Sequence, residues 1–290
     1  MRLSLLSTCF IAALSLSTAL TAAPAASPPQ TGDTLAAVAR HGIVPVNGVD
    51  YYYELHGQGE PLLLLHGGLG SGAMFGPNIE ALAKHRTVIL VDLQGHGRTA
   101  LGQRPFSVDA IGDDMAALVQ RLGYARVDVL GYSLGGGIAL RMAVQQPAQV
   151  GKLVLVSASY SNDAFYPSIR GQQNTLNAKA ADAFKNTPIY QGYAAVAPKP
   201  EEFPRLLDAI GGFLSRPFDW SADVPKLQGP VMLVFGDSDL YRPESEIAFF
   251  QLLGGGKRDG GWQREGVSKH RLAILPDMTH YEIGSSPRLV

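Results

Sequence analysis

Cysteine is nearly absent from this chain of 290 residues, and its one cysteine is Cys9. This scarcity excludes a disulfide framework and a metal site built on cysteine ligands. An excess of one charge is also absent, since 24 Lys and Arg residues almost balance 25 Asp and Glu residues. No run of basic residues occurs either. We therefore expect no nucleic-acid partner.

Histidine and carboxylate residues do not cluster with the spacing of a metal site, and no segment repeats at the period of a solenoid. We expect no metal and no cofactor. Apolar residues make up 46% of the chain and charged residues 17%. This composition can build a sizeable core and carries no sign of disorder.

The first 25 residues differ from the rest of the chain. Arg2 supplies a short positive start, and residues 3–20 are apolar and small with interspersed Ser and Thr. Ala23-Pro24-Ala25 fits the pattern of a cleavage site, and residues 21–23 offer a second site. We interpret residues 1–25 as a signal peptide, which predicts a periplasmic or secreted protein. The alternative is an uncleaved membrane anchor, but the run is barely long enough to span a bilayer. We do not expect the mature chain to insert stably into a membrane.

Residues 26–43 are predicted to be a linker, because residues 26–34 are rich in Pro, Ser, Thr and Gly. Residues 44–55 predict two strands joined by a turn at Asn47-Gly48. Six further apolar runs follow, and most lack the alternation of a half-exposed strand, which indicates a parallel sheet covered on both faces. These runs are residues 61–65, 87–91, 127–130, 153–156, 231–235 and 272–275.

Helical patterns separate these runs, over residues 107–122 with Ser107 as the N-cap, residues 134–146 and residues 244–253. The alternation predicts one α/β domain over residues 44–290, with a doubly wound, mostly parallel sheet and helices on both faces. Residues 159–224 interrupt it without a central-strand signal. We interpret this stretch as a small, mainly helical lid, and the alternative is ordinary crossover helices.

The segment Gly131-Tyr132-Ser133-Leu134-Gly135 has the G-x-S-x-G spacing of a sharp turn between a strand and a helix, with the serine at its apex. A predicted strand precedes it and a predicted helix follows it. Ser133 is therefore the predicted nucleophile. A serine hydroxyl needs a base that removes its proton, and that base should be a histidine oriented by a carboxylate.

His280 is the predicted base because it follows the last predicted strand, and active sites of open α/β sheets lie at the carboxyl ends of strands. His270 precedes that strand and falls at the opposite end. Asp239, just beyond the strand over residues 231–235, is the predicted acid. Asp237 is the alternative acid, although a role in organising the turn suits it better.

Backbone N–H groups should stabilise the negatively charged oxygen that forms during acyl transfer. Leu134, at the start of the helix after Ser133, supplies the first predicted donor. The glycine-rich loop over residues 66–72 supplies the second, with Gly68 preferred and Leu69 as the alternative. His66 opens this loop directly after a buried strand, where we predict a structural role.

The segment Gly95-His96-Gly97-Arg98-Thr99-Ala100 loosely matches a dinucleotide-binding pattern. That pattern requires a helix starting there and an acidic residue after the next strand. The next predicted helix starts only near residue 107, so we do not expect a nucleotide site.

Together, the segments 66–68, 92–98, 131–136, 236–239 and 276–280 resemble the α/β-hydrolase fold family, in the branch of carboxylesterases, enol-lactonases and C–C bond hydrolases. The resemblance covers residues 44–290 and implies a Ser133-His280-Asp239 triad. Relatives that use an aspartate nucleophile are disfavoured by Ser133. In the family a complete helix follows the catalytic histidine, whereas ten residues follow His280 here. Without that helix we expect exposed apolar sheet surface.

The predicted function is therefore an exported serine hydrolase that cleaves carboxylic esters or lactones through an acyl-enzyme. Its small-molecule substrate should be of small or medium size and partly apolar, because the predicted lid is aromatic. A C–C bond hydrolase or an acyl transferase with the same triad is the alternative. A non-catalytic binding protein on the same fold is the remote one. The sequence does not define the oligomeric state.

Overall fold

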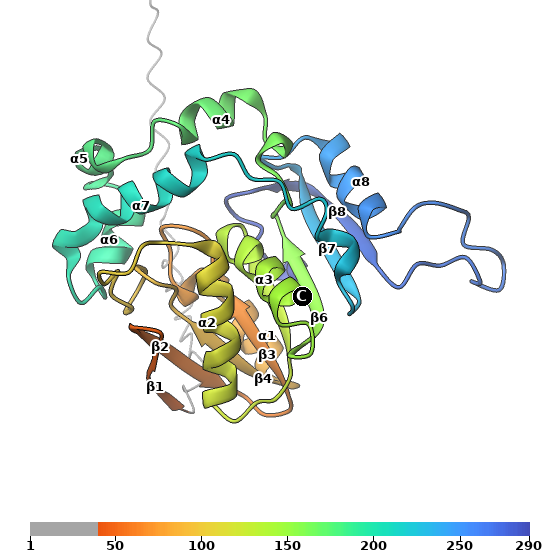
Figure 1. Ribbon diagram of the computed structural model, residues 1–290, viewed down its shortest axis with the longest axis horizontal. Helices are drawn as coiled ribbons and strands as arrows, with labels where there is room; N and C mark the ends of the chain where they lie inside the picture. Colours follow the sequence, from red (N-terminus) through yellow and green to blue (C-terminus); the bar gives the residue numbers. More distant parts are fainter. Residues whose placement is uncertain (1–39) are drawn as a thin grey trace, which may run out of the picture. The chain divides into compact units, whose positions relative to one another are not determined.

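The computed structural model describes residues 40–290. The predicted signal peptide and residues 26–39 of the predicted linker lie outside the described residues. Eight strands form one sheet in the order β1-β2-β4-β3-β5-β6-β7-β8 (Figure 1). Strands β3 to β8 run parallel to one another, whereas β2 pairs antiparallel with both β1 and β4, which confirms a mostly parallel sheet. The strands are β1 (Arg40–Val46), β2 (Val49–His56), β3 (Glu60–Leu65), β4 (Arg86–Val91), β5 (Val127–Tyr132), β6 (Val150–Val156), β7 (Val231–Ser238) and β8 (Arg271–Thr279).

Strand β1 begins at Arg40, so residues 40–43 of the predicted linker are strand. Arg40 and His41 pair with Leu55 and Glu54 of β2. The sequence pattern missed this start because β1 is an edge strand whose first residues are exposed and polar. The turn at Asn47-Gly48 is present as predicted, and both residues have positive φ.

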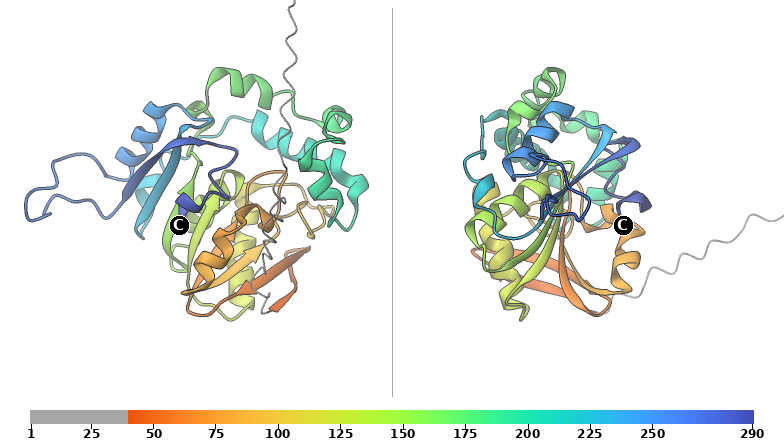
Figure 2. Two further views of the ribbon diagram at one scale, coloured as in Figure 1. Left: turned by 180° about the vertical axis from the view of Figure 1, so that it is seen from behind. Right: turned by 90° about the vertical axis from the view of Figure 1, so that its right-hand side faces the viewer.

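Helices cover both faces of the sheet, as predicted. Helices α2 (Val108–Arg121) and α3 (Leu134–Gln145) lie together on the face toward the viewer in Figure 1. Helix α1 (Asn78–Ala83) and the C-terminal residues lie on the other face, seen from behind in Figure 2. The Ser107 side chain caps α2 by accepting a hydrogen bond from the N–H of Ala110 at 3.3 Å, as the sequence predicted.

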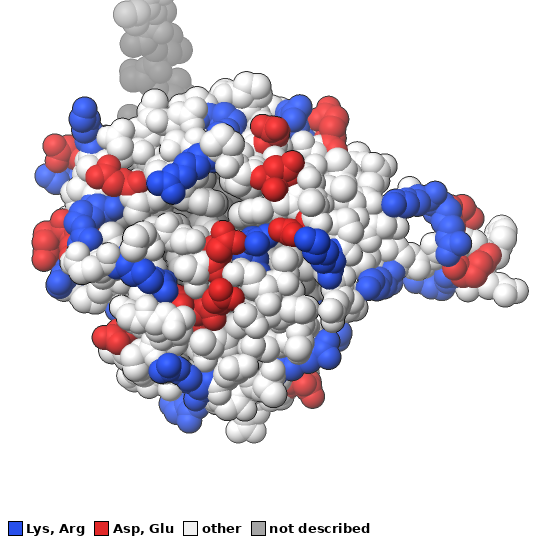
Figure 3. Space-filling view, in the orientation of Figure 1, with Lys and Arg blue, Asp and Glu red and all other residues white. Residues whose placement is uncertain are grey.

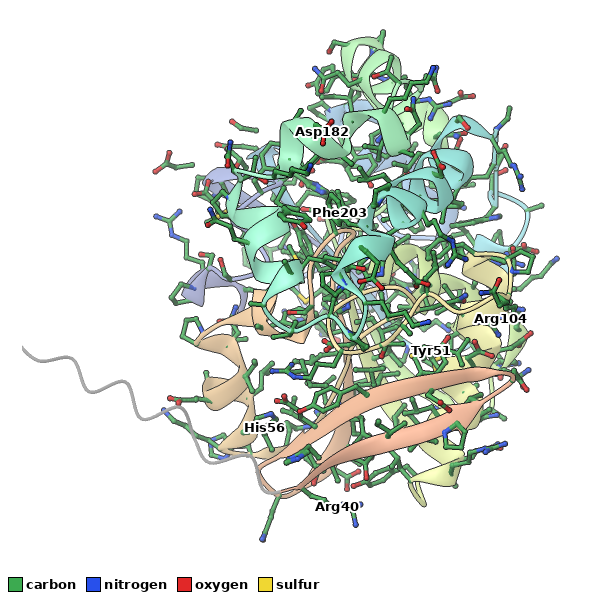
Figure 4. The ribbon with its side chains drawn as sticks, turned by 90° about the vertical axis from the view of Figure 1, so that its left-hand side faces the viewer. Arg40, Tyr51, His56, Arg104, Asp182 and Phe203 are labelled. Carbon is green, nitrogen blue, oxygen red and sulfur yellow. The ribbon has the colours of Figure 1, made fainter. Side chains whose placement is uncertain are left out.

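A buried carboxylate fastens α2 to the edge hairpin. Asp114 on α2 accepts hydrogen bonds from the Tyr51 hydroxyl on β2 at 2.6 Å and from Arg104 at 2.5 Å. Figure 4 shows Tyr51 and Arg104 on the same side of the domain. A buried carboxylate is costly unless it is paired, and these partners offset that cost.

Residues 159–224 connect β6 to β7 and are mainly helical. They contain α4 (Pro167–Gln173), α5 (Ala181–Phe184), α6 (Pro188–Ala194) and α7 (Phe203–Ser215). Their own apolar cluster centres on the buried Phe203, which Figure 4 shows among these helices. Leu101, outside the insertion, joins the same cluster. We refer to residues 159–224 as the insertion. Helix α8 (Pro243–Leu252) then connects β7 to β8.

After His280 the described residues form turns and a single 3-10 turn over Pro287–Leu289, with no α-helix. The Asn78 side chain of α1 donates hydrogen bonds to the carbonyls of Gly284 and Ser286, both at 3.0 Å. Met232 and Ile274, on β7 and β8, are 38% and 41% exposed. These two side chains reach the surface at the β7–β8 edge of the sheet.

Charged side chains of both signs intermingle on the face that Figure 3 shows. Over the described part of the chain, no helix has the length and apolar character needed to cross a membrane.

Candidate active site

Ser133 occupies the turn between β5 and α3, where φ is 53° and ψ is −116°. A side chain at Gly131 would collide with the backbone of Gly135 and Gly136, and one at Gly135 would collide with the carbonyl of Leu65. Both glycines are therefore required for the turn to close. A serine in this conformation is strained, and such strain persists only where the surroundings fix it.

The structure brings Ser133, His280 and Asp239 together. The Ser133 Oγ lies 3.0 Å from His280 Nε2, and His280 Nδ1 lies 2.8 Å from Asp239 Oδ1. His280 follows β8 and Asp239 follows β7, so both stand at the carboxyl ends of parallel strands. The predicted residues thus form one continuous hydrogen-bonded chain.

Asp239 is enclosed and well supplied with donors. Its Oδ1 also accepts the N–H of Leu240 at 2.7 Å, and its Oδ2 accepts the N–H of Gly236 at 3.2 Å and the Ser157 hydroxyl. Burial alone would raise the pKa of Asp239, but the hydrogen bonds from His280 and Ser157 and the charge of His280 outweigh burial and lower it. The carboxylate is therefore ionised at neutral pH.

The other residues weighed from the sequence lie elsewhere. Asp237 is exposed and accepts the N–H groups of Asp277 and Met278, at 3.0 and 3.3 Å. It therefore holds the loop that leads to His280 and does not contact the histidine ring. His270 immediately precedes β8, and its Nδ1 accepts the N–H of Val231, the first residue of β7, at 3.2 Å.

The two segments predicted to donate N–H groups to the oxyanion, the start of α3 and the loop over residues 66–72, lie side by side. A Cβ placed on Gly68 would sit 3.8 Å from the Leu134 Cβ, and Gly68, Leu69 and Leu134 all line the same cavity as Ser133. Leu69 has a φ of 60°, so this loop is also locally strained. The contacts place both Gly68 and Leu69 near Ser133 and do not choose between them.

His66 stabilises the loop over residues 66–72 through two hydrogen bonds. Its Nδ1 lies 2.7 Å from the carbonyl of Gly67, and its Nε2 accepts the N–H of Leu93 at 3.0 Å. Burial lowers the pKa of His66 to about 4, so the ring is neutral at pH 7 and can donate at one nitrogen and accept at the other. This arrangement joins the ends of β3 and β4, as expected of a structural histidine.

The segment 95–100 forms a tight loop without a helix at its start, since α2 begins only at Val108. Asp92 closes this loop onto its neighbour by accepting the N–H groups of Arg98 and Gly72, each at 2.8 Å. Within residues 40–290, no three His, Cys, Asp or Glu side chains are grouped as a metal site would require.

A cavity of about 1110 Å³ opens over Ser133 and His280. Aliphatic and aromatic side chains of the insertion form much of its wall, including Leu176, Phe184, Tyr193, Ile210, Phe213 and Trp220. Apart from His280, Arg98 is the one Lys, Arg, His, Asp or Glu residue among the described residues that line the cavity. Its guanidinium stands 3.6 Å from Asp92 and 3.8 Å from Glu54, so its charge is already balanced.

Two residues of this region were missed by the sequence reasoning. The Tyr132 hydroxyl donates to the carbonyl of His280 at 2.6 Å and so fixes the backbone that carries the histidine. Ser157 binds Asp239. No spacing pattern identifies either residue, although Ser157 is the first polar residue after a buried strand that neighbours β5.

Residues 60–194 match the family described as the alpha/beta hydrolase fold. A protein of Agrobacterium fabrum, provisionally named carbamate hydrolase RutD, is 31% identical over 217 residues, which cover 66% of this chain and 81% of that protein. The chain belongs to the α/β-hydrolase fold family.

Other relatives align over different lengths. The pimeloyl-[acyl-carrier protein] methyl ester esterase of Nitrosospira multiformis is 27% identical over 82% of this chain and 94% of its own length. Some matches are shorter, and the chain spans only 44% of the RutD protein of Azorhizobium caulinodans. Among solved structures, a thermophilic esterase from Thermogutta terrifontis superposes with a TM-score of 0.66 at 19% identity, over 87% of this chain and 95% of that one. That likeness concerns the fold.

Proposed function

We propose that this protein is a serine hydrolase that cleaves carboxylic esters or lactones with an apolar acyl part, through an acyl-enzyme on Ser133. The observation that carries the proposal is the hydrogen-bonded chain from Ser133 through His280 to Asp239 at the floor of an apolar cavity. An ester-cleaving relative that aligns over most of both chains supports the same reaction class.

In the first half-reaction His280 Nε2 takes the proton of the Ser133 hydroxyl as Oγ attacks the substrate carbonyl carbon. Asp239 holds the imidazole through Nδ1 and stabilises its positive charge. The carbonyl oxygen becomes an oxyanion, which the N–H of Leu134 and a second N–H from Gly68 or Leu69 stabilise. The C–O bond to the alcohol then breaks, and His280 returns the proton to the leaving oxygen. Water repeats these steps on the acyl-enzyme and releases the acid.

The cavity favours a neutral, largely apolar substrate. Burying an unpaired charge costs several kcal/mol, and the charged wall residue Arg98 already has two carboxylate neighbours. A volume of about 1110 Å³ exceeds the need of an acetyl group. We therefore expect activity to increase from acetyl to medium-length acyl chains.

Export is part of the proposal, and it is supported by the sequence of residues 1–25 alone. Amino-terminal sequencing of the protein recovered from a native host would test it. A start near residue 24 or 26 in a periplasmic or extracellular fraction is expected. Recovery of the uncleaved chain in the membrane fraction would contradict it.

The central test compares wild type with Ser133→Ala on p-nitrophenyl esters of two to twelve carbons. We expect Ser133→Ala to lose at least about a thousandfold in kcat, because the nucleophile is gone. A fluorophosphonate probe should label wild type at Ser133 and leave the variant unlabelled. Near-wild-type turnover by Ser133→Ala would overturn the mechanism, and a wild type that neither turns over nor labels would indicate a binding protein.

A substrate panel tests the ester or lactone assignment itself. Lactones, 1,3-diketones, carbamates and esters with an added alcohol acceptor should be offered to the same wild-type preparation. Faster turnover of esters or lactones is expected. Preference for a 1,3-diketone or for transfer to the alcohol would reassign the enzyme to C–C bond hydrolysis or acyl transfer with the triad retained.

A further inference from the structure

Asp239 must stay ionised and keep its orientation if it is to orient His280. Burial of the Asp239 carboxylate disfavours the ionised form. Its side chain has no solvent-exposed surface. A second carboxyl group, Glu246 on α8, is 3% exposed and interacts electrostatically with Asp239. Burial, and then the charge of Asp239, raise the pKa of Glu246 to about 8. Asp239 therefore depends on its hydrogen-bond donors for its charged form.

Three of the four hydrogen-bond donors to Asp239 come from its own turn and from His280. The N–H groups of Gly236 and Leu240 belong to the turn that carries Asp239, and the third donor is the His280 ring. The fourth is the Ser157 hydroxyl, which comes from the end of β6 and binds Oδ2, the oxygen that His280 does not use. Among residues 40–290, Ser157 is thus the one side chain other than His280 that hydrogen-bonds Asp239, and it binds the other carboxylate oxygen.

The backbone of Ser157 indicates that the hydroxyl matters. Its φ is 45°, a conformation that glycine adopts freely and other residues adopt at a cost. The residue is completely buried, so its hydroxyl must find a partner within the protein. A glycine would relieve the strain and remove the need for that partner. A serine at this position is accounted for by the hydrogen bond to Asp239.

We infer that Ser157 is a positioning residue of the active site, which holds Asp239 in the orientation and charge state needed to align His280. This inference rests on the proposed function. Ser157 does not contact the cavity, so its loss should change the rate of chemistry and leave substrate binding intact.

The test compares Ser157→Ala and Ser157→Gly with wild type on the best p-nitrophenyl ester. Both variants lose the hydroxyl, but only glycine also relieves the backbone. If Ser157 positions Asp239, both should lose roughly tenfold in kcat with KM unchanged, and both should react more slowly with the fluorophosphonate at Ser133. Ser161→Ala is the matched control, because Ser161 is a buried serine of the same segment that binds Asp163 and not Asp239.

The outcomes are distinct. A wild-type kcat in Ser157→Gly, with or without a change in thermal stability, would overturn the inference. The enzyme would then work without the Ser157 hydroxyl, and any loss in Ser157→Ala would come from backbone strain alone. A failure of both variants to fold would overturn it as well, since a positioning residue is dispensable for folding. An equal loss in Ser161→Ala would show a general effect of the segment. A wild type without turnover or labelling would instead defeat the proposed function.

Discussion

Ser133 and Ser157 occupy equivalent places on adjacent strands and yet differ in nearly everything else. Each follows the last residue of its strand, and Tyr132 and Val156 are paired partners in β5 and β6. Each donates its N–H to the next strand, Ser133 to Val156 at 2.9 Å and Ser157 to Val234 at 2.8 Å. Each has positive φ, at 53° and 45°.

What separates the two serines is the surroundings of the turn. Ser133 is followed by α3 and its hydroxyl reaches His280 at the cavity, whereas Ser157 leads into the insertion and its hydroxyl reaches Asp239 below the surface. The tight strand-to-helix turn at Ser133 forces glycines at two fixed positions, and those glycines make it visible in the sequence. The turn at Ser157 needs no such glycines. Strain of the same kind therefore leaves a motif at one site and none at the other.

The largest effect should come from Asp239, which Ser157 contacts directly and Ser133 contacts only through His280. In Asp239→Asn the amide can no longer stabilise the charged imidazole or fix its tautomer, so kcat should fall by about ten-thousand-fold. Asp237→Asn is the matched control and should stay far closer to wild type, because it keeps one of the two acceptor oxygens and does not contact His280. A steady-state assay of both variants decides the matter. If Asp237→Asn lost more activity than Asp239→Asn, Asp237 would be the catalytic acid, and the contact of Ser157 with Asp239 would have no role in catalysis.

A smaller effect should appear in folding stability, with opposite signs at the two serines. Ser133→Gly relieves strain at the half-buried floor of the cavity and should increase the free energy of unfolding by about 1 kcal/mol. Ser157→Gly relieves similar strain but removes a donor to a buried carboxylate, so it should decrease that free energy by about 1 kcal/mol. Urea denaturation measures both values. Equal gains in both variants would show that the Ser157 hydrogen bond contributes little.

The last comparison concerns Glu246, a buried carboxyl group that interacts electrostatically with Asp239. Its pKa is raised to about 8, so the folded protein keeps a proton that the unfolded chain releases above its usual pKa near 4.5. Stability should therefore be lost as the pH rises from about 4.5 to about 8. Glu246→Gln carries no such proton, and its melting temperature relative to wild type should increase across that range.

Glu244→Gln, on the exposed first turn of the same helix, removes the same formal charge and serves as the control for Glu246→Gln. Its melting temperature relative to wild type should not follow that trend. A constant difference between Glu246→Gln and wild type from pH 5 to pH 8.5 would contradict the raised pKa of Glu246.

Much of the fold could be predicted because the controlling signals are local. The apolar runs set the parallel strands, Asn47-Gly48 set the hairpin turn, and Ser107 set the start of α2. The start of β1 at Arg40 could not be predicted, because an exposed edge strand needs no apolar residues and is held by main-chain pairing. The insertion was expected only as an aromatic, mainly helical stretch, since the shape of the cavity wall depends on how α5, α6 and α7 pack together around Phe203.

The sequence by itself determined the turn at Ser133, the alternation of strands and helices along the chain, and the position of His280 beyond the last strand. These depend on steric limits and on hydrophobic patterns that act over a few residues. Tertiary structure alone decided that Asp239 and not Asp237 contacts His280, and that Ser157 and Tyr132 support the acid and the histidine. The contacts of Ser157 and Tyr132 join residues that are 82 and 148 positions apart in the sequence. Asp237 and Asp239 are only two positions apart, so a local pattern does not decide which of them contacts His280.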